Sequence, residues 1–288
     1  MLTTNSLNLA LKFRSILGGS EGADMSDLVV NGNIVFDGVG GRTGYYADLG
    51  EAFDALLPDK ILYMISNDPT VDSVGYGTIN VAAGTTVFGM GIAAGFTGDT
   101  KLVLNSTEFR NVHITGNSMT SSALIEIPVG ASTSRFYDCV FSNSALPCIE
   151  IVAGSTGYTF ANNTSFGNSA TNIDVLDAGI LGMYMKACRV GYYKVNAASV
   201  ATPEISGSEI KKLEINAAFK GKVTHNLIGD LVITVNPHAD AKITFNQIET
   251  HSCANAWAPT APKFSHNTFE TALDADITDP ASSYNVVP

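Results

Sequence analysis

The chain has 288 residues, of which 45% are hydrophobic and 15% charged, a composition typical of a folded protein with a sizeable core. Its formal net charge is −11 and its isoelectric point is about 4.7, so nucleic acid and anionic membrane surfaces are not expected partners. Because the sequence has no run of 18 apolar residues, we also expect no membrane insertion.

Residues 1–44 form a predicted N-terminal arm. Apolar residues at 6–17 have helical spacing, and a Gly-rich stretch at 18–22 is typical of a linker. Two basic residues follow the apolar patch instead of preceding it, which does not fit a signal peptide. An apolar stripe with little of its own to pack against favours docking onto another protein. The candidate attachment residues are Leu7, Leu11, Lys12 and Arg14.

Two short apolar runs in the same arm, 28–30 and 34–36, flank the dipeptide Asn31-Gly32. This arrangement predicts a β-hairpin, because Asn-Gly is the preferred sequence of a tight hairpin turn. Helix, linker and hairpin together are interpreted as an attachment device. The alternative is an irregular cap on the domain that follows.

The next segment, 45–59, contains a predicted capping helix that begins at Asp48 and ends before Pro58. Asp48 and Glu51 have the spacing of a capping box. A single apolar stripe is formed by Leu49, Ala52, Phe53, Leu56 and Leu57. Since the open end of a stack of strands exposes unpaired edges and an apolar core, we expect this helix to cover one.

One short pattern recurs over residues 60–270: an apolar residue, a small or polar residue three positions later, and a second apolar residue two positions after that. Its clearest copies are 20, 18, 20 and 21 residues apart and start at Met185, Ile205, Val223, Ile243 and Phe264. Earlier copies, 24 to 27 residues apart, start at Phe109, Phe136 and Phe160. A repeat of this period indicates a solenoid. Residues 271–288 carry no copy and are taken as a C-terminal tail.

Asparagine is the most frequent residue at the middle position of this pattern. A straight strand cannot turn both apolar residues inward, so the chain must bend there. Asparagine tolerates left-handed backbone conformations, and stacked amides donate to one neighbour and accept from the next. The sequence therefore predicts a ladder of stacked side chains at Asn163, Asn226, Asn246 and Asn267.

A second predicted strand follows each bend and alternates apolar, charged and apolar residues. In three successive copies the charged residue is acidic, and stacking places such residues about 4.8 Å apart. Paired carboxylates act in retaining glycosidases, and clustered ones bind Ca²⁺. The same position holds Lys194 and Glu214 in the next copies, which is typical of an ordinary polar face. The candidate catalytic residues are Glu126, Glu150 and Asp174.

These strand–bend–strand copies resemble the right-handed, pectate-lyase-like parallel β-helix family. The resemblance implies an all-β, single-chain right-handed parallel β-helix, preceded by the capping helix and the arm. It rests on the repeat: neither the basic catalytic residues nor the Ca²⁺-binding aspartates of pectate lyases are recognisable, and no aromatic sugar platform is evident beside the acidic column. We therefore favour a protein without catalytic residues.

Cysteine and histidine positions indicate neither a metal site nor a cofactor. His225 and His266 share a position in the repeat, but Phe245 lies between them, which makes them poor joint ligands. The cysteines lack the spacing of metal sites and are interpreted as buried free thiols: Cys139, Cys148, Cys188 and Cys253. We expect no metal and no cofactor.

A short, capped β-helix on an N-terminal arm resembles bacteriophage virion proteins, which are usually homotrimers. The resemblance implies a non-enzymatic protein, made in the host cytoplasm and displayed on the particle as a capsid-decorating (cement) protein or a short tail spike or fibre. The expected partners are its own copies, a capsid or tail protein bound through the arm, and a host surface glycan. Two alternatives stay open: a polysaccharide-degrading lyase or hydrolase, and a non-catalytic module that binds host glycans.

Overall fold

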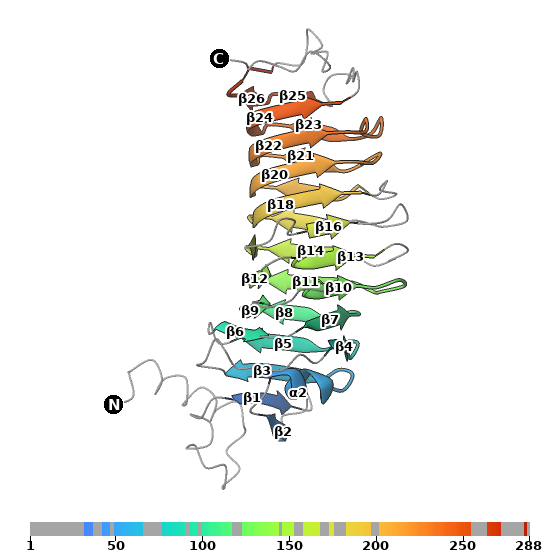
Figure 1. The fold of residues 1–288 in the computed structure, drawn as a ribbon, viewed down its shortest axis with the longest axis vertical. Coiled ribbons are helices and arrows are strands. Elements are labelled where there is room, and N and C mark those ends of the chain that lie inside the picture. Colours follow the sequence, from blue (N-terminus) through green and yellow to red (C-terminus); the bar gives the residue numbers. More distant parts are fainter. Residues whose placement is uncertain are drawn as a thin grey trace, which may run out of the picture.

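The chain is an all-β parallel solenoid, in which short strands stack along one axis as shown by the computed structural model (Figure 1). The structure describes residues 32–36, 42–46, 49–65, 77–89, 93–96, 99–116, 123–143, 146–152, 158–167, 173–175, 183–196, 202–254, 264–271 and 285–286. No helix in these ranges is long and apolar enough to cross a membrane.

The first sheet has 12 strands in the order β2-β1-β3-β5-β8-β11-β14-β17-β19-β21-β23-β25. From β3 onward every pairing in it is parallel. Its strands are β1 Gly32–Phe36, β2 Arg42–Tyr46, β3 Ile61–Ile65, β5 Thr86–Gly89, β8 Glu108–Arg110, β11 Ser134–Tyr137, β14 Thr159–Asn162, β17 Met183–Lys186, β19 Glu204–Ser206, β21 Lys222–Thr224, β23 Lys242–Thr244 and β25 Phe264–Ser265.

The second sheet has 14 strands that form two columns and merge at β18, which pairs with both β15 and β16. One column is β6 Ala93–Phe96, β9 His113–Gly116, β12 Val140–Asn143 and β15 Ser165–Gly167. The other is β4 Gly77–Val81, β7 Thr100–Leu104, β10 Ile125–Ile127, β13 Ile149–Ile151 and β16 Ile173–Val175. The merged strands are β18 Arg189–Val195, β20 Glu209–Ile215, β22 Leu227–Ile233, β24 Gln247–Cys253 and the short β26 Thr268–Phe269.

The merging of the two columns explains the two repeat spacings in the sequence. Before β18, a coil needs separate strands in the two columns and a connection between them. From β18 to β24, one seven-residue strand contributes to both columns, so the connection disappears. The later copies are therefore shorter than the earlier ones.

Alternation of buried and partly exposed residues gives each strand one inward face, as period-two patterning requires. The inward residues form one continuous apolar core along the axis. In its first half the core is filled by phenylalanine rings: Phe109 lies 5.6 Å from Phe136, and Phe141 lies 5.8 Å from Phe166. These contacts hold neighbouring coils in register.

The bend differs from the prediction by one residue. The left-handed conformation falls immediately before the middle position of the pattern, as at Asn111 (φ 52°) and Asp138 (φ 55°). In the later coils it falls on His225, Phe245 and His266, with φ between 57° and 59°. Because the middle residue points its side chain into the core, the residue before it adopts the left-handed conformation that turns the chain. Bulky side chains rarely adopt this conformation.

At the N-terminal end, α2 (Leu49–Asp54) is shorter than the helix expected from the sequence. Its Phe53 is buried, with the ring 6.3 Å from that of Phe109, against the first coils. Gly32, expected in a hairpin turn, is the first residue of β1, and this strand pairs antiparallel with β2 and β3. The partner expected for it at 28–30 lies outside the described residues, as does most of the arm. The capping role of the helix stays a prediction.

The C-terminal tail contributes to the stack, although no repeat was expected there. Val286 forms a parallel bridge with Thr268. The backbone N–H of Phe269 donates to the carbonyl of Val286, and that of Val286 donates to the carbonyl of Asn267. Two residues of the tail thus begin a further coil beyond β25 and β26.

Candidate functional site

Asn226, Asn246 and Asn267 stack in the core, on successive coils, as a continuous hydrogen-bonded ladder. The backbone N–H and the side-chain Nδ2 of Asn226 both donate to Oδ1 of Asn246, each at 3.0 Å. Asn246 makes the same two bonds to Asn267, also at 3.0 Å. Each amide also donates to a backbone carbonyl, so no polar atom of the ladder is left without a partner.

The ladder extends beyond these residues in both directions. Ser208 donates its backbone N–H to Oδ1 of Asn226, and its own hydroxyl oxygen accepts from the N–H of Cys188. At the other end, Asn267 donates to Oδ1 of Asn285 in the tail. Sequence reasoning missed Asn285, although it follows Asn267 by 18 residues, the same interval that separates Ser208 from Asn226.

Asn163 is not part of the ladder, so that prediction is wrong by one position. The strand register aligns Ala161 with Phe136 and Met185, which makes Ala161 the inward residue of this coil and turns Phe160 outward. The core position of the ladder is then Thr164, whose buried hydroxyl accepts from the N–H of Cys139 at 3.4 Å. Asn163 lies at the surface and donates to the carboxylate of Asp138.

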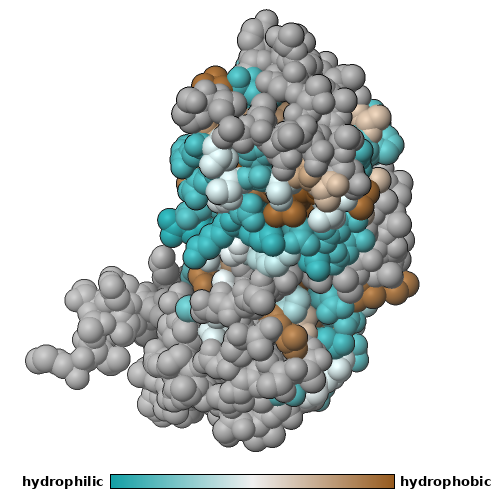
Figure 2. Space-filling model, turned by 45° about the horizontal axis from the view of Figure 1, so that its top comes forward, coloured by the Kyte–Doolittle hydropathy of each residue, from teal (hydrophilic) through white to brown (hydrophobic). Residues whose placement is uncertain are grey.

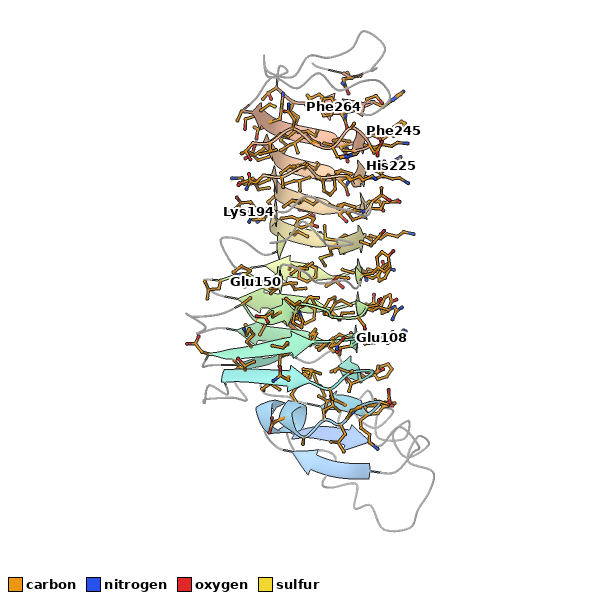
Figure 3. All side chains as sticks on the ribbon, turned by 90° about the vertical axis from the view of Figure 1, so that its right-hand side faces the viewer. Glu108, Glu150, Lys194, His225, Phe245 and Phe264 are labelled. Atoms are coloured by element: carbon orange, nitrogen blue, oxygen red, sulfur yellow. The ribbon has the colours of Figure 1, made fainter. Side chains whose placement is uncertain are left out.

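The acidic column has the register that the sequence predicts: Glu126 lies opposite Glu150, and Glu150 opposite Asp174. Glu126 forms an ion pair with Lys101, at 2.6 Å. The side chain of Asp174 lies outside what the structure describes. The column continues through Lys194 to Glu214. In Figure 3, Glu150 and Lys194 lie on one flank of the solenoid, opposite Glu108, His225 and Phe245.

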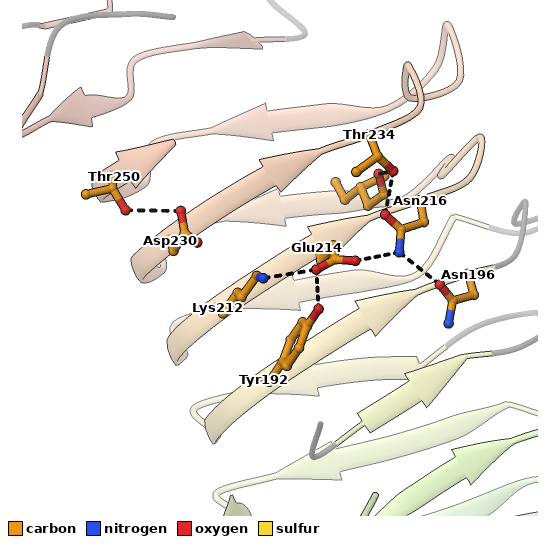
Figure 4. A network of polar contacts seen from close by, with 9 residues as sticks. Tyr192, Asn196, Lys212, Glu214, Asn216, Asp230, Thr234 and Thr250 are labelled. Carbon is orange, nitrogen blue, oxygen red and sulfur yellow. Dashed lines mark hydrogen bonds and ion pairs between the residues drawn. The ribbon is translucent and has the colours of Figure 1, made fainter. Parts of the chain in front are cut away.

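Glu214 sits at the centre of a polar network on this face (Figure 4). Its carboxylate accepts hydrogen bonds from the Tyr192 hydroxyl and from Nδ2 of Asn216, and pairs with Lys212. Burial opposes ionisation, but these contacts outweigh it and lower the pKa of Glu214 to about 2. Glu214 is therefore ionised at neutral pH.

An aromatic pocket lies on the outer face of the first sheet, where sequence reasoning identified no site. Its volume is about 270 Å³, and it spans strands β11, β14, β17 and β19. The rings of Phe160 and Tyr184 are stacked 5.1 Å apart, and Tyr158 borders both. The residues that line it are Tyr137, Phe160, Ala161, Asn162, Tyr184, Met185, Lys186, Glu204 and Ser206, of which Ala161 and Met185 turn their side chains into the core.

Charged side chains lie at both ends of the aromatic pocket along the solenoid axis. The guanidinium of Arg135 lies 5.8 Å from the centre of the Phe160 ring, a cation–π contact. At the other end, Glu204 forms a long ion pair with Lys222, at 4.0 Å. Burial, helped by the nearby Tyr158 and the Glu204 carboxylate, raises the pKa of Tyr184, so its hydroxyl keeps its proton.

A second aromatic group is formed by the bend residues of the last coils. Phe245 is 49% exposed and is sandwiched between His225 and His266, with ring centres 5.1 and 4.6 Å away. Because both histidine rings stack on Phe245, they cover its faces instead of converging on an ion.

Figure 2 shows a face where hydrophilic residues predominate and hydrophobic ones form small separate patches.

The cysteines of the described coils are buried, and none is in a disulfide. Burial raises the pKa of the Cys139 thiol to about 12, and that of Cys188 in the same direction. Within the described ranges, no three His, Cys, Asp or Glu side chains are grouped closely enough to hold a metal ion. The candidate attachment residues Leu7, Leu11, Lys12 and Arg14 lie outside these ranges.

A scan against models of known protein families gives no match to this chain. Searches of curated proteins and of solved structures give none either.

Proposed function

We propose that the chain is a non-enzymatic structural protein of a bacteriophage virion, displayed on the particle surface. It is a right-handed β-helix that assembles as a homotrimer, either as a capsid-decorating (cement) protein or as a short tail spike or fibre. The N-terminal arm of residues 1–44 attaches it to a capsid or tail protein, through Leu7, Leu11, Lys12 and Arg14.

The observation that carries the proposal is the buried ladder that joins Cys188 and Ser208 to Asn285 across the last coils. Together with a continuous apolar core, it ties successive coils through side-chain as well as backbone hydrogen bonds. Such a rod suits a protein that must stay folded outside the cell. Two outward carboxylates, Glu126 and Glu214, are committed to lysine partners, as expected of a structural surface.

The free, buried state of the cysteine thiols favours a protein that assembles in a reducing compartment. Cys139 and Cys188 are buried and protonated, and neither contributes to a crosslink. A protein that folds in a host cytoplasm has no oxidising step in which to form disulfides.

Mass spectrometry of gradient-purified virions tests the proposal. The chain should copurify with the particles in a fixed ratio to the major capsid protein, and sedimentation of the isolated protein should give three times the mass of one chain. Its absence from particles, in a host that expresses it, would contradict the virion role.

The enzymatic alternative keeps one observation in its favour, the register of Glu126 beside Glu150. A polysaccharide lyase or hydrolase would release new chain ends from a capsular or pectic polysaccharide. The loss of such a measured activity in Glu150→Gln would establish the alternative.

A further inference from the structure

We propose that copies of the chain assemble through unlike faces: the outer face of the first sheet in one copy packs against the outer face of the second sheet in the next copy. Coils at equal height along the axis meet in this arrangement. A coil is here one strand of the first sheet together with the strands of the second sheet that follow it before the chain returns. The proposal rests on the homotrimer proposed above and names the surfaces and the orientation through which its copies bind one another.

The outer face of the first sheet is basic, although the chain as a whole has a net charge of −11. From β3 to β25, its strands carry five basic and two acidic residues, all of them at least partly exposed. These are Arg110, Arg135, Lys186, Lys222 and Lys242, with Glu108 and Glu204. Two copies of this face would bring like charges together, so the face does not suit a symmetric contact with itself.

Charges of opposite sign occur on the two sheets of the same coil. Three coils carry a single lysine or arginine on the first sheet and a single carboxylate on the second: Arg135 with Glu150, Lys222 with Asp230, and Lys242 with Glu249. The two sheets face opposite flanks, as the labelled Glu108 and Glu150 show in Figure 3. The two charges of a coil therefore face different neighbours, and they complement each other only across a contact between copies.

The other charged coils are mixed. In the coil of β8, the first sheet carries an internal ion pair, and the coils of β5 and β14 carry a charge on the second sheet alone. In the coil of β19, Glu204 lies level with two lysines and two carboxylates of β20. The coil of β17 is the exception, because Lys186 lies level with Arg189 and Lys194. Opposite signs thus predominate along the described coils.

The symmetry of the assembly follows from this pattern. A contact between unlike faces continues from copy to copy and closes into a ring where the rotation allows it. Rotation about an axis parallel to the solenoid keeps every coil at its height, so Arg135 of one copy meets Glu150 of the next, and Lys242 meets Glu249. A neighbour running in the opposite direction would lose this match. The copies therefore lie parallel, with their N-terminal ends together.

Aromatic side chains add apolar area to the basic face. Tyr63 stacks on Phe88, and Phe160 stacks on Tyr184, and all four side chains are partly exposed. Tyr158, beside the second pair, is 37% exposed. Aromatic residues and arginine are enriched where proteins bind one another. Because stacking covers the ring faces, the rings offer their edges to a flat neighbouring sheet.

The test uses the full chain and one exposed pair, Lys242 and Glu249. Sedimentation over a dilution series gives the concentration at which half of the oligomer dissociates, and energy transfer between labelled copies gives the rate of subunit exchange. Lys242→Glu should raise both values at least about tenfold, because it sets two carboxylates against each other in every contact of the ring. Glu249→Lys should do the same with two ammonium groups. The double variant restores opposite charges and should return both values to within about threefold of those of the unmodified chain.

The matched control is Lys220→Glu, which makes the same change of charge in the connection between β20 and β21, outside both faces. It should assemble like the unmodified chain. Three results would overturn the proposed contact and leave the homotrimer standing: unchanged assembly of Lys242→Glu, no recovery in the double variant, or an equal loss in the control. A monomeric unmodified chain would overturn the homotrimer itself, and this contact with it.

Discussion

The Asn246→Leu substitution tests the ladder most severely, because Asn246 is its central buried residue. The side chain is 2% exposed and accepts from both the backbone N–H and the Nδ2 of Asn226. Leucine offers no acceptor, so the N–H of Asn226 loses this partner inside the core. Asn246 also donates to the carbonyls of Val223 and Thr244, bonds that leucine cannot make.

The expected cost follows from these lost contacts. A buried donor left without a partner costs about 1–3 kcal/mol, and each further lost bond about 1 kcal/mol. The greater apolar burial of leucine offsets about 1–2 kcal/mol. We expect a net destabilisation of roughly 2–4 kcal/mol. At about 2–4 °C per kcal/mol, this lowers the melting temperature by roughly 4–16 °C.

Thermal unfolding followed by far-ultraviolet circular dichroism measures this change. The control is Asn162→Leu, the same chemical change at an exposed strand position, which should alter stability by no more than about 0.5 kcal/mol. Equal melting temperatures for the unmodified chain and Asn246→Leu would refute the reasoning, because the amide ladder would then add nothing to stability.

The remaining predictions concern pH, thiol reactivity, catalysis and attachment. Because the pKa of Glu214 is lowered to about 2, its stabilising contribution is present above the ordinary value of 4.5 and is lost as the pH falls towards 2. Glu214→Gln should remove this part of the acid dependence in unfolding titrations between pH 5 and pH 2, and an unchanged profile would contradict it. Cys139, buried and with a pKa of about 12, should resist iodoacetamide at pH 8 until the protein unfolds, whereas rapid labelling of the native chain would place it at the surface. Glu150→Gln should match the unmodified chain in assays on capsular and pectic polysaccharides, with neither releasing chain ends. Deletion of residues 1–31, which removes Leu7, Leu11, Lys12 and Arg14 but leaves β1 paired with β3, should preserve the β-rich circular dichroism and oligomeric state but abolish binding to particles that lack the protein. Persistent binding would show that the attachment surface lies on the solenoid or the tail.

The repeat predicted the solenoid because its anchors are large apolar residues at regular intervals. Ile205, Val223 and Ile243 lie opposite one another in the first sheet, as their spacing requires. The same rule failed at Phe160, because a large ring looks like an anchor in sequence. The inward place there belongs to Ala161, beside a core in which the Phe136 and Phe166 rings lie 6.5 Å apart.

Because the repeat placed Phe160 instead of Ala161 at the inward position, it predicted neither Thr164 as the core residue of that coil nor the aromatic pocket. A displacement of one residue exchanges the two faces of a strand, so Phe160 was counted as core and its stacking on Tyr184 was not visible. Network contacts such as Tyr192 with Glu214 join residues 22 positions apart. Their pairing depends on the register of adjacent coils, which the repeat fixed, but also on side-chain directions, which it did not.

Electron cryomicroscopy of the parent particle, compared with particles that lack the protein, tests the virion role most directly. The account predicts extra density on the surface of the complete particle: threefold-symmetric, rod-shaped, with its long axis pointing outward and the N-terminal end of each chain against a capsid or tail protein. Identical maps of the two particles would contradict it.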